Sequence, residues 1–203
     1  MKKIENIIAD LKNLFPKTKI ALDYKNNWQL LVAVQLSAQC TDKKVNEITP
    51  ALFKKYPKLE DYASANIKEF EQDIKPSGFY HNKAKNIIGA AKTVKEKFNG
   101  KLPKTMKEML TIPGIGRKSA NVILGNAYGV VEGIAVDTHV RRLSKKLGLT
   151  KSTNPDIIER DLMKQIPKEE WFGFTYRLID YGRKYCHARP HDHKNCPLAK
   201  YYV

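Results

Sequence analysis

The sequence predicts an all-α protein of roughly ten helices. Apolar residues recur at the three-to-four-residue spacing of amphipathic helices along most of the chain, whereas the alternation typical of strands is nearly absent. Prolines, glycines and short polar runs separate these stretches and mark helix ends. No internal repeat and no low-complexity linker interrupts the chain, so any division should be a cleft between packed lobes rather than a flexible joint.

The individual helices follow from local patterns. An apolar stripe at helical spacing begins at Ile4 and stops near Pro16. Residues 28–37 are apolar on most sides, which fits a buried helix or a strand, and the length of this run and the absence of flanking turn pairs favour a helix. Residues 81–98 predict an amphipathic helix that ends before Gly100. Two more helices are expected to begin at Asp42 and at Ala65. Five further helices are expected at residues 105–110, 117–128, 137–147, 154–165 and 171–184.

The charge of the chain indicates a polyanionic partner. It carries 37 Lys and Arg residues against 21 Asp and Glu residues, a formal net charge of +16. Such a field concentrates polyanions near the surface, which makes nucleic acid the leading candidate. A lysine-rich coding bias would explain the same charge, because the lysines are scattered along the chain.

Cysteine usage and hydropathy predict the compartment. The 203 residues include only three cysteines, which are too few and too unevenly spaced for a secreted disulfide scaffold. The first residues form a charged helical segment without the pattern of a signal peptide, and no apolar run reaches membrane-spanning length. We therefore expect a soluble monomer of the cytoplasm that associates with the nucleoid.

Residues 110–120 predict a helix-hairpin-helix. The sequence LTIPGIGRKSA joins an apolar helix end, a turn with two glycines and a new amphipathic helix. The glycines allow positive φ and close backbone approach, and the first amides of the second helix point outward at positive potential, where a DNA phosphate fits. An ordinary helix cap followed by a turn is the alternative. The expected DNA contacts here are Pro113, Gly114, Ile115, Gly116, Arg117 and Ser119.

Lys118 lies in the first turn of the second hairpin helix. The positive end of the helix and the adjacent Arg117 disfavour a protonated amine there, and a deprotonated lysine is what Schiff-base chemistry requires. A lysine that only contacts a phosphate is the alternative, and physical arguments alone favour it.

Asp137 follows an extended apolar segment, residues 133–136, and stands at the start of a helix. Aspartate is a good N-cap, and capping explains most residues of this kind. The same carboxylate can stabilise a developing sugar cation or guide proton transfer, so capping and catalysis are compatible.

These two segments carry a family resemblance. The run LTIPGIGRKSANV at 110–122, followed by VDTHVRRL at 136–143, closely resembles the endonuclease III branch of the helix-hairpin-helix DNA glycosylases. The resemblance implies that Lys118 displaces a damaged base from C1′, forms an imine and promotes β-elimination, while Asp137 assists. It also implies that His139 contacts DNA and that the substrate is double-stranded DNA with oxidised pyrimidines or abasic sites.

Two further segments extend the resemblance. LSAQCTD at 36–42 is similar to the segment whose glutamine fills the hole left by a flipped nucleotide, which assigns that role to Gln39. GFYHNKA at 78–84 is similar to the loop that wedges an apolar side chain into the base stack, with Phe79 in that place. Alternatively Phe79 is a staple to the core, and Asp42 either caps a helix or binds DNA near the site.

The family likeness also implies the domain organisation. A central helical bundle with the helix-hairpin-helix is expected at residues 20–130, and a second lobe at residues 1–19 plus 131–203. The DNA-binding cleft of this two-lobed glycosylase fold would lie between the lobes.

The C-terminal tail departs from the family pattern. Many members hold a [4Fe-4S] cluster with four cysteines spaced C-x6-C-x2-C-x5-C. The corresponding positions here are Cys186, His193, Cys196 and Tyr202. With two cysteines replaced, we expect a tail that binds no metal and no cofactor. The alternatives are zinc held by Cys186, Cys196 and two of His187, His191 and His193, or a cluster with other ligands.

Three other functions compete. A monofunctional adenine-excising glycosylase would lack Lys118 and carry an extra C-terminal domain. A non-catalytic DNA clamp would need no carboxylate close to the phosphates, so the presence of Asp137 argues against this function. A glycosylase for oxidised guanine also uses a lysine, but the sequence around Lys118 resembles the pyrimidine branch more.

Overall fold

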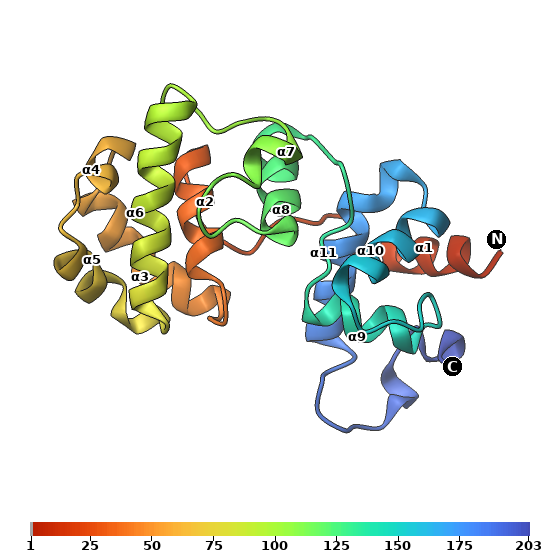
Figure 1. The fold of residues 1–203 in the computed structure, drawn as a ribbon. Coiled ribbons are helices and arrows are strands. Elements are labelled where there is room, and N and C mark those ends of the chain that lie inside the picture. Colours follow the sequence, from red (N-terminus) through yellow and green to blue (C-terminus); the bar gives the residue numbers. More distant parts are fainter. Residues whose placement is uncertain (1) are drawn as a thin grey trace. The chain divides into compact units, whose positions relative to one another are not determined.

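The structure, a computed structural model, describes residues 2–203 and is built from helices (Figure 1). Those residues contain eleven α-helices, four short 3-10 helices and no β-strand. The predicted all-α class is therefore confirmed. Across residues 2–203 no helix combines the length and apolar character that crossing a membrane requires.

The chain forms two compact units. Residues 21–130 make one, called here the central unit, and the chain segments before and after it make the other, the terminal unit. The central unit contains α2 (Asn27–Leu36), α3 (Asp42–Lys55), α4 (Leu59–Ala63), α5 (Ile67–Ile74), η1 (Lys75–Ser77), α6 (Tyr80–Lys97), α7 (Met106–Met109) and α8 (Arg117–Tyr128).

Helix α2 is the centre of the central unit. The side chain of Asn26 accepts a hydrogen bond from the Gln29 amide at 2.9 Å and so starts the helix. Nine of the ten residues of α2 are buried, because it packs against α3, α6 and α8. The continuous apolar run therefore belongs to a buried helix and not to a strand.

A cluster of aromatic rings forms a second part of this core. The rings of Trp28, Tyr56, Tyr62 and Phe70 contact one another with centroids 5.2–5.8 Å apart. Tyr62 and Phe70 are fully buried. Tyr62 belongs to α4, a helix of five residues that the sequence pattern did not predict, because it is too short to show a period.

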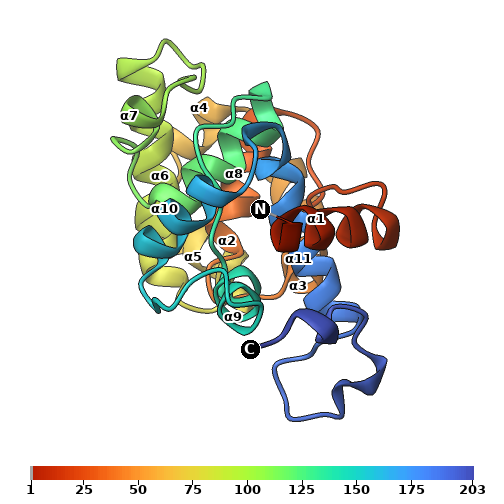
Figure 2. The ribbon, with the colours of Figure 1, turned by 90° about the vertical axis from the view of Figure 1, so that its right-hand side faces the viewer.

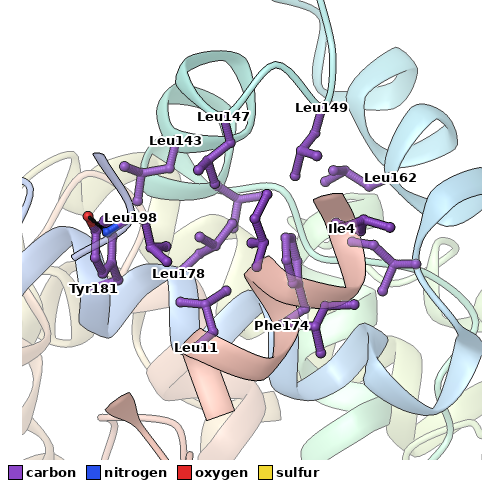
Figure 3. Packing of buried hydrophobic residues seen from close by; sticks show 14 of the residues in the cluster. Ile4, Leu11, Leu143, Leu147, Leu149, Leu162, Phe174, Leu178, Tyr181 and Leu198 are labelled. Carbon is purple, nitrogen blue, oxygen red and sulfur yellow. Dashed lines mark hydrogen bonds between the residues drawn. The ribbon is translucent and has the colours of Figure 1, made fainter. Parts of the chain in front are cut away.

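The terminal unit is built from both chain ends. Its helices are α1 (Lys2–Leu14), α9 (Thr138–Lys146), α10 (Pro155–Gln165), η2 (Lys168–Glu170), α11 (Trp171–Lys184), η3 (His193–Asn195) and η4 (Ala199–Tyr201). Helix α1 packs on α11, and α9 packs on α10 and α11. Figure 3 shows Leu11 of α1 among the side chains of Leu143, Phe174 and Leu178, all buried. This core supports the start of α9, where Asp137 lies.

The segment after α11 leaves the helical body as a loop. Figure 2 shows it in dark blue, below α11, before the chain turns back toward its C-terminus. The returning end is tied down, because Leu198 is fully buried and the Val203 amide donates a hydrogen bond to the Lys146 carbonyl at 3.0 Å.

Candidate active site

The turn of the predicted hairpin is anchored on two helices of the central unit. The buried side chain of Gln35, on α2, donates a hydrogen bond to the Pro113 carbonyl at 2.7 Å. Gly114 has φ +77°, and a Cβ there would lie 2.8 Å from the Cβ of Asn86 on α6. Ile115 is buried. Only glycine suits position 114, for its backbone angle and for the space available.

The turn presents the start of α8. Gly116 is the N-cap residue and has no side chain with which to cap the helix. The amides of a first helical turn have no acceptor within the helix and lie at its positive end. Arg117 and Lys118 are exposed here, whereas Ala120, Ile123 and Leu124 on the same helix are buried. The buried face of α8 thus fixes which side of the helix carries the two basic side chains.

Asp137 occupies the corresponding place on α9 in the terminal unit. It is the N-cap residue, and its Oδ1 accepts a hydrogen bond from the Val140 amide at 2.8 Å. Ile134, Ala135 and Val136 before it are buried, which holds the approach to the helix. Asp137 is half-buried, so this residue keeps access to solvent.

The structure gives His139 a packing contact that the sequence did not reveal. Its ring lies against α11 where Gly182 leaves room, since a Cβ at Gly182 would collide with Nδ1 of the ring. His139 is half-buried as a result. Its expected role in DNA binding stays a prediction.

A pocket of about 230 Å³ in the central unit brings several expected DNA contacts together. Gln39 and Phe79 line it with Gly114 and Ser119 of the hairpin. Gln39 has φ 52° and Phe79 has φ 50°, both in the left-handed region that non-glycine residues rarely adopt. Strain of this kind collects at functional sites. The Phe79 side chain is 63% exposed, so it is not a staple to the core.

Lys83 links the two strained turns, and the sequence did not single it out. Its side chain is only 5% exposed, and Nζ donates hydrogen bonds to the carbonyls of Leu36 at 2.8 Å and Ser77 at 2.7 Å. Burial lowers the pKa of this amine. The sequence feature that could have predicted its burial is its position on α6, where it shares the buried face with Ala84 and Ile87.

Asp42 is the first residue of α3, but it is not the cap. The preceding Thr41 is the N-cap, and its hydroxyl accepts a hydrogen bond from the Lys44 amide at 3.2 Å. Asp42 is half-buried beside it. The capping alternative for Asp42 is therefore wrong, and its part in DNA binding stays a prediction.

Four possible metal ligands converge in the C-terminal loop of the terminal unit. One donor atom each from Cys186, His191, His193 and Cys196 lies within 4.8 Å of the other three. The structure thus brings together both cysteines and two of the three candidate histidines, His191 and His193, whereas His187 is outside the group. These residues could hold a metal ion.

Comparison with known proteins identifies the family. Residues 32–168 match the HhH-GPD superfamily of base excision DNA repair proteins. The chain is 50% identical to endonuclease III of Synechocystis sp. over 193 residues, which cover 95% of this chain and 88% of that relative.

Solved structures give the same result. A non-covalent endonuclease III–DNA complex has a TM-score of 0.94 and 42% identity, covering 99% of this chain and 94% of the other. A trapped covalent endonuclease III–DNA intermediate gives the same TM-score of 0.94, identity of 42% and coverage of 99% and 94%. The chain therefore belongs to the endonuclease III family of base excision DNA repair proteins.

Proposed function

We propose that Lys118 and Asp137 perform the chemistry of this repair enzyme, with Lys118 as the nucleophile and Asp137 as its carboxylate partner. As a member of the endonuclease III family, the protein is a DNA glycosylase and AP lyase that removes oxidised pyrimidines and cleaves abasic sites. The observation that carries the assignment is the placement of Lys118. It is an exposed amine in the first turn of a helix whose hairpin is held rigidly by Gln35 and Gly114.

The reaction begins with attack of the Lys118 amine on C1′ of the damaged nucleotide. The bond from C1′ to the base breaks, and its electron pair leaves with the base, which takes up a proton. The Asp137 carboxylate stabilises the positive charge that develops on the sugar and guides the proton lost by the amine. Its cap bond to the Val140 amide fixes the carboxylate in place for this role.

Strand cleavage follows from the same covalent bond. The sugar ring then opens at the C1′–O4′ bond, whose electron pair stays on O4′, and this oxygen takes up a proton. The nitrogen lone pair forms the second bond of a protonated imine between Nζ of Lys118 and C1′. Loss of a proton from C2′ then expels the 3′ phosphate by β-elimination, and water hydrolyses the imine and restores the amine. A relative solved as a trapped covalent intermediate with DNA supports this course.

The hairpin and the pocket beside it hold the DNA. The positive start of α8 and the turn at 113–116 suit a backbone phosphate, which positions the strand without reading its sequence. Displacing a base from the duplex costs a few kcal/mol. Phe79 wedges the base stack, and Gln39 fills the gap that remains. The exposure of Phe79 and the left-handed backbone of both residues support these roles.

Borohydride trapping tests the assignment. It reduces an imine between protein and DNA to a stable bond, so wild-type protein should be trapped on duplexes with an oxidised pyrimidine or an abasic site. Lys118→Ala should bind these duplexes and yield no trapped species. The matched control is Lys107→Ala, which removes an exposed lysine from the first hairpin helix and should be trapped like wild type. Undiminished trapping of Lys118→Ala would refute the assignment, and binding of damaged DNA without any trapping in wild type would favour a monofunctional glycosylase.

Two further proposals concern the compartment in which the protein acts and metal binding by its C-terminal tail. An enzyme that repairs chromosomal DNA acts where the chromosome lies, which supports a place in the cytoplasm at the nucleoid. The expectation of a metal-free tail stays untested, and the four converging donors support zinc instead.

A further inference from the structure

The loop between α11 and the C-terminus gathers four donors from eleven residues. Cys186, His191, His193 and Cys196 follow the spacing C-x4-H-x-H-x2-C. Both sulfurs are buried and both imidazoles are half-buried, so the donors face inward from a loop that is otherwise largely exposed. Nothing in the proposed repair chemistry uses these residues.

The distances suit one tetrahedral ion. Nε2 of His191 and Nδ1 of His193 each lie 3.4 Å from Sγ of Cys196. Zinc bonds of about 2.3 Å to sulfur and about 2.0–2.1 Å to nitrogen give a tetrahedron with edges of about 3.3–3.8 Å. All four donor atoms lie within 4.8 Å of one another, so no separation has to shorten by more than about 1.0–1.5 Å to match these edges.

The same residues do not fit the iron-sulfur cluster of the family. Such a cluster takes four thiolates, and only two are present. Four irons and four sulfides also fill the space between the ligands, which must then stand further apart than around a single ion. The hydroxyl of Tyr202, at the fourth family position, instead lies 2.9 Å from that of Tyr181.

Neighbouring groups orient the donors. Nδ1 of His191 lies 2.8 Å from the Arg189 carbonyl, which fixes the proton on that nitrogen and leaves Nε2 for a metal. Arg142, on α9, donates hydrogen bonds to the Cys186 carbonyl at 2.6 Å and to its sulfur at 3.5 Å, and so holds this residue in place. Both contacts are of the kind that supports metal ligands.

One contact must change. Nζ of Lys146 lies 2.5 Å from Nε2 of His193, the nitrogen that carries the proton once Nδ1 binds a metal. The ring of Tyr202 lies 4.9 Å from the same ammonium and offers it a second partner.

We propose that Cys186, His191, His193 and Cys196 bind one Zn²⁺ ion, which closes the loop 186–196 onto the end of α11 and against α9. The two thiolates neutralise the ion, and the four ligands complete its shell, as in structural zinc sites. The metal would stabilise the terminal unit, because binding energy is gained only when the loop is folded.

Metal analysis of the purified full chain tests the proposal. We expect about one zinc per chain and no stoichiometric iron or visible absorption. Removing the zinc with a chelator should lower the melting temperature, and added Zn²⁺ should restore it. Loading the stripped protein with Co²⁺ should give the intense visible bands of a tetrahedral site with sulfur ligands.

Matched variants locate the site. Cys196→Ser and His191→Gln should each lose the zinc and the cobalt bands, and the half-exposed His191 gives a readout if the buried cysteine variant fails to fold. His187→Gln, in the same loop but outside the four donors, should keep both. Stoichiometric iron, failure of the stripped protein to take up Zn²⁺, or full zinc binding by His191→Gln would each overturn the proposal. Trapping by Lys118 reports separately on the repair chemistry.

Discussion

Lys83 places an amine on the face of α6 that otherwise packs into the core. Its two hydrogen bonds reach carbonyls 47 and 6 residues away in the sequence. They join the end of α2 to the turn before Phe79, so one side chain holds the backbone beside both strained residues of the pocket. Its part in the site is to position groups, since it is buried.

Lys83→Met should lower the free energy of unfolding by about 1–3 kcal/mol, because two buried carbonyls lose their donor while the apolar stem is kept. Excision of an oxidised base should slow as well, because the turns that carry Gln39 and Phe79 lose their link. Chemical denaturation and single-turnover excision measure the two effects. Lys85→Met, on the exposed side of α6, is the control and should change stability by less than about 0.5 kcal/mol. Equal effects of the two substitutions would contradict the positioning role.

Gly114→Ala should destabilise the hairpin by about 1–3 kcal/mol, because the new Cβ meets Asn86 at 2.8 Å on a backbone of positive φ. Gly100→Ala is the control, since φ is +75° there and nothing lies within 4 Å of the added atom. The difference between the urea unfolding midpoints of the two variants measures the effect of the contact between the new Cβ and Asn86. A Gly114→Ala variant no less stable than Gly100→Ala would mean that Asn86 can move away freely.

At the scale of elements, α9 combines a structural and a chemical use of one carboxylate. The Oδ1 atom of Asp137 caps the helix through the Val140 amide, and the proposed reaction uses the charge. Asparagine caps helices about as well as aspartate but carries no charge. The two uses can therefore be separated by substitution.

Asp137→Asn should keep the stability of the wild type and lose base excision, whereas Asp137→Ala should also lose about 1 kcal/mol of stability with the cap. Thermal unfolding and single-turnover kinetics measure the two properties side by side. Near-normal excision by the stable Asn variant would show that only the cap matters.

The elements were predicted wherever apolar spacing ran over several turns. Helix α6, expected at 81–98, covers Tyr80–Lys97. Helix α4 was missed because five residues are too few to show a helical period. It is stabilised by a hydrogen bond from the Lys58 amide to Asp61 at 2.7 Å and by packing of Tyr62 on Trp28, which is distant in the sequence. Lys118 and Asp137 could be predicted because each lies in a short sequence motif. Lys83 could not be predicted, because its hydrogen-bond partners are brought to it by the tertiary structure. The choice of His191 over His187 likewise depends on the path of the loop.

At the scale of the whole molecule, alkaline pH should weaken the fold through its buried phenols. Burial, with a hydrogen bond to Asp73, raises the pKa of Tyr56 to about 12, and burial also raises the pKa of Tyr62. A phenol whose folded pKa lies above its unfolded value of 10.0 contributes stability below that pH and loses it as the pH rises toward 12.

The free energy of unfolding should accordingly fall between about pH 9 and pH 11, by at most about 1.4 kcal/mol per pH unit for each phenol. Urea titrations at the two pH values measure the fall. Tyr56→Phe should reduce it, because the new ring cannot ionise. An unchanged pH dependence in that variant would place the alkaline effect elsewhere.

The joining of both chain ends in one unit also sets an order of events during synthesis. The central unit has its own core, so we expect it to fold once residue 130 has left the ribosome. Helix α1 must wait, since the faces that cover Leu11 come from residues 134–198. Its apolar stripe is therefore exposed while more than half of the protein is made, and a nascent chain stalled before α11 would present that stripe to chaperones and proteases.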